Sequence, residues 1–86
     1  MPIKNSITVS LIIPVYNRQV FLNKALKSVL SQTTIPDEII IVDDNSLIPI
    51  RIPKEYKNNN IMLLRNEINL GTSASRNLGI YNSSSN

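Results

Sequence analysis

The feature that most constrains the fold is a helical pattern of apolar residues placed between two short aliphatic runs. The first run, residues 9–14, reads VSLIIP, and the second, residues 38–42, reads EIIIV. Between them, apolar side chains recur at the spacing of one helix face over residues 19–32. A strand, a helix and a second strand within about thirty residues form a right-handed unit whose strands are parallel neighbours. The pattern therefore predicts an α/β fold.

Two further elements extend this unit. Residues 61–64 (IMLL) predict a third strand, and residues 73–81 predict a short helix with Thr72 or Ser73 as its N-cap. Residues 47–53 carry two prolines and alternating isoleucines, which predict an extended, partly packed segment. The proline at position 14 is expected to end the first strand, because it cannot donate to a ladder. The prediction is one small domain with a parallel three-stranded sheet and flanking helices.

The composition excludes several classes of function. Nine Lys and Arg against six Asp and Glu give a net charge of +3, but the cations are scattered, so nucleic-acid binding is not expected. The absence of Cys and His removes disulfides, thiolate and imidazole chemistry and the usual zinc ligands. Residues 1–10 lack the apolar core of a signal peptide, and no aliphatic run could span a bilayer. We expect a soluble, cytoplasmic chain with no membrane segment and with residues 82–86 as a polar tail.

Polar motifs follow each of the three predicted strands. They read PVYNR after the first strand, DDNS after the second and NLGTSASRN after the third. The carboxyl ends of parallel strands share one edge of a sheet, where ligands of such folds gather, so we expect the motifs to lie together. The adjacent carboxylates Asp43 and Asp44 have two explanations at this point. They are either solvated turn residues that cap backbone N–H groups or part of a ligand site.

Taken in order, the stretches VSLIIPVYNR, LNKALKSVLSQ, EIIIVDDNS and NLGTSASRNLGI resemble the amino-terminal half of the family 2 glycosyltransferases. The resemblance covers residues 9–80. It implies a partial GT-A (Rossmann-like) three-layer fold with sheet order 3-2-1. It also implies that residues 1–86 are the truncated nucleotide-sugar-binding part of a glycosyltransferase domain. The reaction implied for a full-length parent enzyme transfers a sugar from a nucleoside diphosphate sugar to an acceptor hydroxyl.

The resemblance further implies roles for individual residues. Tyr16 is expected to lie against the base of the nucleotide. Asp44 is expected to accept hydrogen bonds from base or ribose, with Asp43 and Pro14 beside it. The residue chemistry suits these roles, because a phenol ring offers a flat apolar face and a carboxylate accepts the N–H of a uracil-type ring. The plainer alternatives are that Tyr16 covers the end of the sheet and that Asp43 is a solvated turn residue.

A phosphate-binding side is also implied. Free backbone N–H groups at Gly71, Thr72 and Ser73, where a helix begins, would favour phosphate. Arg76, one turn into that helix, would add a charge-assisted bond to the diphosphate. The plainer alternative is that Arg76 pairs with Glu67 or with a carboxylate of the second loop.

The sequence departs from the family's pattern in two places. Leu47-Ile48-Pro49 stands where the family often continues with another Asp, a Thr and a helix. The Asp-any-Asp motif that holds Mg²⁺ or Mn²⁺ on the donor diphosphate is absent, and so is the acceptor-side base. We therefore assign no catalytic and no metal-binding residue, and we expect the isolated chain to bind no cofactor and to be inactive. Mg²⁺ or Mn²⁺ is implied only for a full-length parent.

Two other functional classes stay open. One is a non-catalytic nucleotide-binding or interaction module that keeps the fold. The other is a phosphoacceptor receiver-like domain, which would need a further acceptor Asp and a later Lys that the sequence does not show. The family's sheet order has another strand beyond the first one. The strand from Val9 to Pro14 is thus expected to be an open edge through which a homodimer could form.

Overall fold

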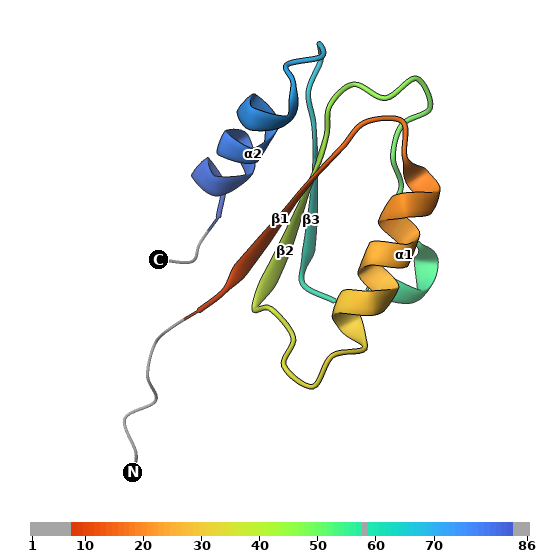
Figure 1. Ribbon diagram of the computed structural model, residues 1–86, viewed down its shortest axis with the longest axis vertical. Helices are drawn as coiled ribbons and strands as arrows, with labels where there is room; N and C mark the ends of the chain where they lie inside the picture. Colours follow the sequence, from red (N-terminus) through yellow and green to blue (C-terminus); the bar gives the residue numbers. More distant parts are fainter. Residues whose placement is uncertain (1–7, 58, 84–86) are drawn as a thin grey trace.

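The computed structural model describes residues 8–57 and 59–83, in which strands and helices alternate along the chain (Figure 1). The elements are β1 (Ser10–Val15), α1 (Gln19–Leu30), β2 (Glu38–Asp43), the short 3₁₀ helix η1 (Lys54–Tyr56), β3 (Ile61–Arg65) and α2 (Thr72–Tyr81). The order of the predicted elements is confirmed, and η1 is an addition to it. None of the helices in the described ranges is long and apolar enough to cross a membrane.

The three strands form one parallel sheet in the order β1-β2-β3, as predicted. The central strand is β2, in which Ile40 lies opposite Ile12 of β1 and Met62 of β3. Every residue of β2 after Glu38 is buried. The helices α1 and α2 lie on opposite faces of the sheet (Figure 1). The predicted partial three-layer α/β fold is therefore confirmed.

The larger core lies between α1 and the sheet. Leu22 and Leu26, one turn apart on α1, are fully buried against strand side chains that point to this face. The residues of this core are Ile13, Val15, Leu22, Leu26, Ile39, Ile41 and Ile50. Ile50 belongs to the segment after β2, in which Leu47 and Ile48 are 88% and 81% exposed. The segment is thus partly packed, as predicted, and it is neither helix nor strand, with bends at Leu47 and Ile48.

On the other face, α2 packs closely over β1 and β2. Its buried residues are Ser75 and Gly79, which lie one turn apart. A Cβ at Gly79 would collide with the Cγ2 methyl of Ile12 and lie 3.4 Å from Cγ2 of Val42. The helix can approach the sheet this closely because glycine stands at the contact.

The first strand does not end at Pro14, contrary to expectation. It continues to Val15, whose C=O accepts a hydrogen bond from the Asp44 N–H at 2.9 Å. In a parallel ladder, alternate residues turn both backbone groups toward the same neighbouring strand. Val15 turns toward β2, so Pro14 turns toward the side without a neighbour, where its missing N–H breaks no bond.

The helix ends differ slightly from the prediction. The last residue of α1 is Leu30 rather than residue 32, and the Ser31 hydroxyl bonds back to the Lys27 C=O at 2.6 Å. The N-cap of α2 is Gly71 rather than Thr72 or Ser73. Gly71 has a φ of 90°, which glycine adopts without strain. The predicted polar tail lies partly outside the described residues, because residues 84–86 are not among them.

Candidate functional site

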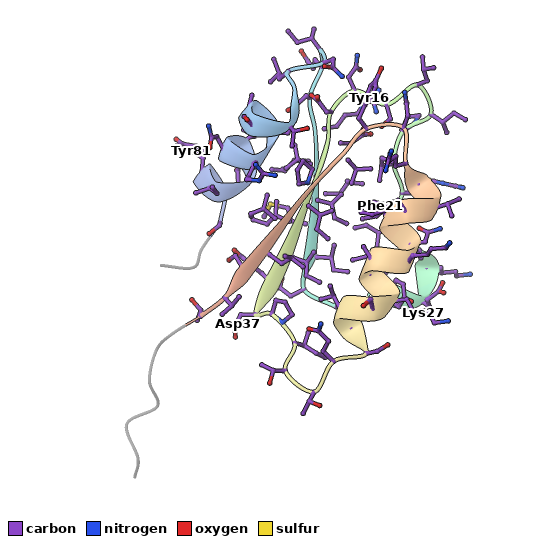
Figure 2. The ribbon with its side chains drawn as sticks, viewed as in Figure 1. Tyr16, Phe21, Lys27, Asp37 and Tyr81 are labelled. Atoms are coloured by element: carbon purple, nitrogen blue, oxygen red, sulfur yellow. The ribbon has the colours of Figure 1, made fainter. Side chains whose placement is uncertain are left out.

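The three polar motifs meet at the carboxyl-terminal edge of the sheet, as predicted. Tyr16 lies at this end of the molecule and Asp37 at the opposite end (Figure 2). Hydrogen bonds join the loop after β1 to the loop after β2, and join the latter to the segment before α2. Stretches that are far apart in the sequence thus form one connected surface.

Asp44 is the link between β2 and α2. It is 4% exposed, and its Oδ1 accepts the Leu70 N–H at 2.7 Å and the Asn66 amide at 2.8 Å. Its Oδ2 accepts the Gly71 N–H at 2.8 Å. Burial by itself would raise the pKa of Asp44, but these hydrogen bonds and one from the Ser75 hydroxyl outweigh it and lower the pKa below 3.8. Asp44 is therefore ionised, and it anchors the chain where α2 begins.

Asp43 turns to the other face of the sheet. It is 1% exposed; its Oδ1 accepts the Ser46 N–H at 2.9 Å, and its Oδ2 accepts the Ile50 N–H at 3.0 Å. Nη1 of Arg65 donates to the same Oδ2 at 2.6 Å. Burial by itself would raise the pKa of Asp43. The hydrogen bonds from the Ser46 hydroxyl, from both N–H groups and from Arg65 outweigh this effect, so the pKa of Asp43 lies below 3.8. The alternative of a solvated turn residue is wrong, although Asp43 does accept backbone N–H groups.

A reciprocal pair of bonds ties the loop after β1 to the loop after β2. The Asn17 N–H donates to Oγ of Ser46 at 2.8 Å, and the Leu47 N–H donates to Oδ1 of Asn17 at 2.8 Å. Asn17 and Asn45 have φ values of 55° and 64°, in the left-handed region that Asn tolerates better than most residues. These contacts hold the backbone next to Tyr16.

The ring of Tyr16 is the open part of this surface. Tyr16 as a whole residue is 49% exposed, and no residue in the described ranges hydrogen-bonds its hydroxyl. Pro14, by contrast, is half-buried within β1. A flat, accessible ring on a fixed loop is suited to stacking against another planar group.

The start of α2 lies beside Asp44. The Gly71 N–H is not free, contrary to expectation, because it donates to Asp44. The first helical bond runs from the Ser75 N–H to the Gly71 C=O at 3.0 Å. The N–H groups of Thr72 and Ser73 therefore have no acceptor within the helix. The N–H of Ala74 is in the same position, so three N–H groups at the start of α2 are able to meet an anion.

Arg76 lies exposed on the first turn of α2. Within the described ranges it forms no salt bridge with Glu67 or with the second loop, where Asp43 pairs with Arg65 instead. The described residues also contain no group of three or more acidic or other ligating side chains that could hold a metal ion. The carboxylates Asp43 and Asp44 are directed at protein donors and do not fit as metal ligands.

Two surface hollows lie on the α1 side of this edge. One of about 400 Å³ is lined by Asn17, Gln19 and residues 47–51, and one of about 560 Å³ extends along α1 toward η1. Neither is lined by Tyr16, Asp44 or Arg76. The candidate site is thus centred on an exposed ring and a helix start.

Sequence reasoning missed the side chains that orient the two carboxylates. Arg65 ends β3 and lies opposite Asp43 in the sheet register, and Asn66 follows it to reach Asp44. A usable signal existed, because the residue that ends the third strand must lie beside the end of the second.

Comparison with known proteins shows the family of the chain, on sequence alone. Residues 10–86 match the sequence model of Glycosyl transferase family 2. An uncharacterized glycosyltransferase of Rickettsia conorii is 44% identical over 82 residues, which cover 91% of this chain and 13% of that protein. An uncharacterized glycosyltransferase of Haemophilus influenzae is 39% identical over 70 residues, which cover 81% of this chain and 24% of that protein. A Campylobacter jejuni protein named as GalNAc(5)-diNAcBac-PP-undecaprenol beta-1,3-glucosyltransferase is 54% identical over 37 residues. These residues cover 43% of this chain and 12% of that protein. The chain spans 12% to 24% of the length of the curated relatives it matches.

Proposed function

Because this chain belongs to the family 2 glycosyltransferases, we propose that it supplies the nucleotide-binding part of an enzyme that transfers a sugar from a nucleoside diphosphate sugar to an acceptor hydroxyl. The observation that carries the proposal is the half-exposed Tyr16 at the carboxyl-terminal end of a parallel sheet, the end at which Asp44 also holds the start of α2.

In the proposed arrangement the base of the nucleotide stacks on Tyr16. A direct hydrogen bond from base or ribose to Asp44 stays a prediction, because the carboxylate already has four protein donors. The ligand would have to displace one of them, and the Asn66 side chain is more easily displaced than the backbone N–H groups. Asp43 and Pro14 act from within the fold, by supporting the loops that carry the ligand contacts.

The diphosphate is proposed to lie toward α2. The N–H groups of Thr72 and Ser73 and the positive end of the helix favour negative charge there. Arg76, exposed and without a salt bridge in the described ranges, supplies a cation within the same turn. The base and the phosphates would thus contact different loops at the carboxyl-terminal end of the sheet.

Because the chain spans 12% to 24% of the length of the curated relatives it matches, sugar transfer is proposed for a longer protein that contains such a part. The Campylobacter relative is named as a glucosyltransferase, which supports the reaction class. The residues of this chain would bind and orient the donor, and we assign none of them as a base for the acceptor hydroxyl. Mg²⁺ or Mn²⁺ for the longer protein stays a proposal, and no role in it falls to Asp43 or Asp44.

Two further properties stay proposals. A cytoplasmic location is one of them. A homodimer through the open edge of β1 is the other, and it is supported by the position of β1 at the end of the sheet order.

Calorimetric titration of the 86-residue chain with UDP and with GDP tests the binding function. We expect Tyr16→Ala to weaken binding about 5- to 100-fold, the range for losing one stacked base. Tyr81→Ala is the matched control, because Tyr81 is 86% exposed at the far end of α2. Asp44→Ala is unsuitable here, because it also removes the anchor of α2.

Equal affinity of the Tyr16→Ala variant and the wild type would exclude the stacking role. If the wild-type chain bound neither nucleotide at millimolar concentration, the nucleotide-binding function itself would be wrong.

A further inference from the structure

One side chain, Arg65, holds the loop after β2 from the end of β3. Its Nη1 donates to Oδ2 of Asp43 at 2.6 Å. Its Nη2 donates to Oδ1 of Asn45 and to the C=O of Ser46, both at 3.1 Å. A guanidinium can serve three acceptors at once because its donors are fixed in one plane, whereas a Lys ammonium is a single point charge.

The loop that Arg65 holds is in an unusual backbone conformation. Asn45 has a φ of 64°, and the two bonds from Nη2 fall on Asn45 and on the next residue, Ser46. Ser46 is also fixed through its N–H, which donates to Asp43. The position of the Ser46 hydroxyl is therefore determined by Arg65 and Asp43 together.

That hydroxyl is the contact on which the neighbouring loop depends. It accepts the Asn17 N–H at 2.8 Å, and the following residue, Leu47, donates back to Oδ1 of Asn17. Asn17 also has a left-handed φ and directly follows Tyr16. The bonds form a continuous path from the guanidinium of Arg65 to the backbone beside the Tyr16 ring.

We infer that Arg65 is a positioning residue for nucleotide binding: it holds Tyr16 in the stacking position through Ser46 and Asn17, and it does not itself contact the ligand. This inference rests on the proposed function. It predicts that loss of Arg65 costs affinity because the ring becomes mobile, so the cost should depend on the base and not on the phosphates.

The test compares uridine with UDP on the wild type and the Arg65→Met variant. We expect Arg65→Met to weaken both ligands by the same factor, about tenfold. Arg65→Lys keeps a cation next to Asp43 but not the three-way contact, and we expect it to bind less tightly than the wild type and more tightly than Arg65→Met. Arg51→Met is the matched control for lost charge. Arg51 is exposed, and only its backbone hydrogen-bonds Gln19.

A second readout needs no ligand. In the free protein, ¹⁵N relaxation and amide exchange at Asn17 and Leu47 should show loosening in Arg65→Met but not in Arg51→Met. Amides of the central strand, such as that of Ile40, should stay protected in both variants. In a Tyr16→Ala background, Arg65→Met should add almost no further loss of affinity.

Three results would overturn the inference. A loss confined to UDP would mean that Arg65 contacts the phosphates directly. Unchanged order of the Asn17 and Leu47 amides in Arg65→Met would show that Arg65 does not fix these loops. Fully additive losses of affinity from Arg65→Met and Tyr16→Ala would show that Arg65 does not act through Tyr16. If the wild type bound no nucleotide, the proposed function would fail, and the loop-order measurement would still decide whether Arg65 positions Tyr16.

Discussion

At the scale of single residues, the two adjacent carboxylates serve different parts of the fold. Successive strand residues point to opposite faces, so Asp43 turns toward the α1 side and Asp44 toward α2. Each receives its own set of donors, and each is ionised although buried. The repulsion expected of neighbouring anions is offset by hydrogen bonds that reach them from residues 46–75.

The lowered pKa values predict a specific loss of stability in acid. In the folded protein, Asp43 and Asp44 bind protons less readily than in the unfolded chain. As the pH falls through the ordinary value of 3.8, the unfolded chain takes up protons first, so the free energy of unfolding decreases. Urea unfolding at pH 7, 5, 4 and 3 should show a plateau above about pH 5 and a decline below it.

Two variants distinguish the contribution of Asp43 and Asp44 to this acid-induced loss of stability from that of the other acidic residues. Asp44→Asn should be less stable at neutral pH and should show a shallower decline in acid. Glu55→Gln, at an exposed position of η1 where no residue in the described ranges bonds the carboxylate, should keep the wild-type decline. A wild-type stability that does not change between pH 7 and pH 3 would contradict the account.

At the scale of elements, apolar periodicity was enough to predict every main helix and strand. The position of the three motifs was also predicted correctly, because the carboxyl ends of parallel strands lie at the same end of the sheet. The strand register could have placed Arg65 beside Asp43, but the backbone donors to Asp44 could not be predicted, since Leu70 and Gly71 belong to a loop about 26 residues further along the chain. Pro14 was misjudged because the sequence does not show which side of the strand lacks a neighbour.

The contact of α2 with the sheet predicts that Gly79→Ala destabilises the protein. Alanine gains about 1 kcal/mol of helix propensity, but overpacking typically costs about 1–3 kcal/mol. Its Cβ would meet a methyl of the β-branched Ile12, which cannot swing away. We expect a net loss of up to about 2 kcal/mol in urea unfolding.

The matched control for this prediction is Asn77→Ala, an exposed position on the same helix, which should be neutral or slightly stabilising. In an Ile12→Ala background, Gly79→Ala should no longer be harmful. If Gly79→Ala stabilised the otherwise unchanged protein, the close contact would not be the reason for the glycine.

At the scale of the whole molecule, no strand in residues 8–57 and 59–83 pairs with the outer side of β1, so the described sheet has an open aliphatic edge. β1 lies at the end of the strand order, and its residues Ser10 and Ile12 alternate with those that bond β2. Their backbone groups therefore point away from the sheet and can pair with another strand. No charged residue lies within β1 to oppose this.

We expect the 86-residue chain to self-associate at micromolar concentration, with two copies pairing through β1. Light scattering should give a mass near twice the 9.7 kDa of one chain. Ser10→Pro removes one outward N–H and should shift the equilibrium toward the monomer, whereas Ser10→Ala, the control for the lost bond from the Ser10 hydroxyl to Glu38, should not. A wild-type monomer whose Ile12 amide exchanges slowly would mean that the edge is protected in another way.

The central claim is that the loops at the carboxyl-terminal end of the sheet bind a nucleoside diphosphate. Chemical-shift mapping tests this claim most directly. On titrating the ¹⁵N-labelled chain with UDP, the account predicts shifts in residues 15–18, 43–47 and 69–76, and none in residues 31–37 at the opposite edge. Tyr16→Ala should reduce the shifts in the first loop, whereas Tyr81→Ala should leave them unchanged. Shifts centred on the hollow along α1, or no shifts at all, would contradict the account.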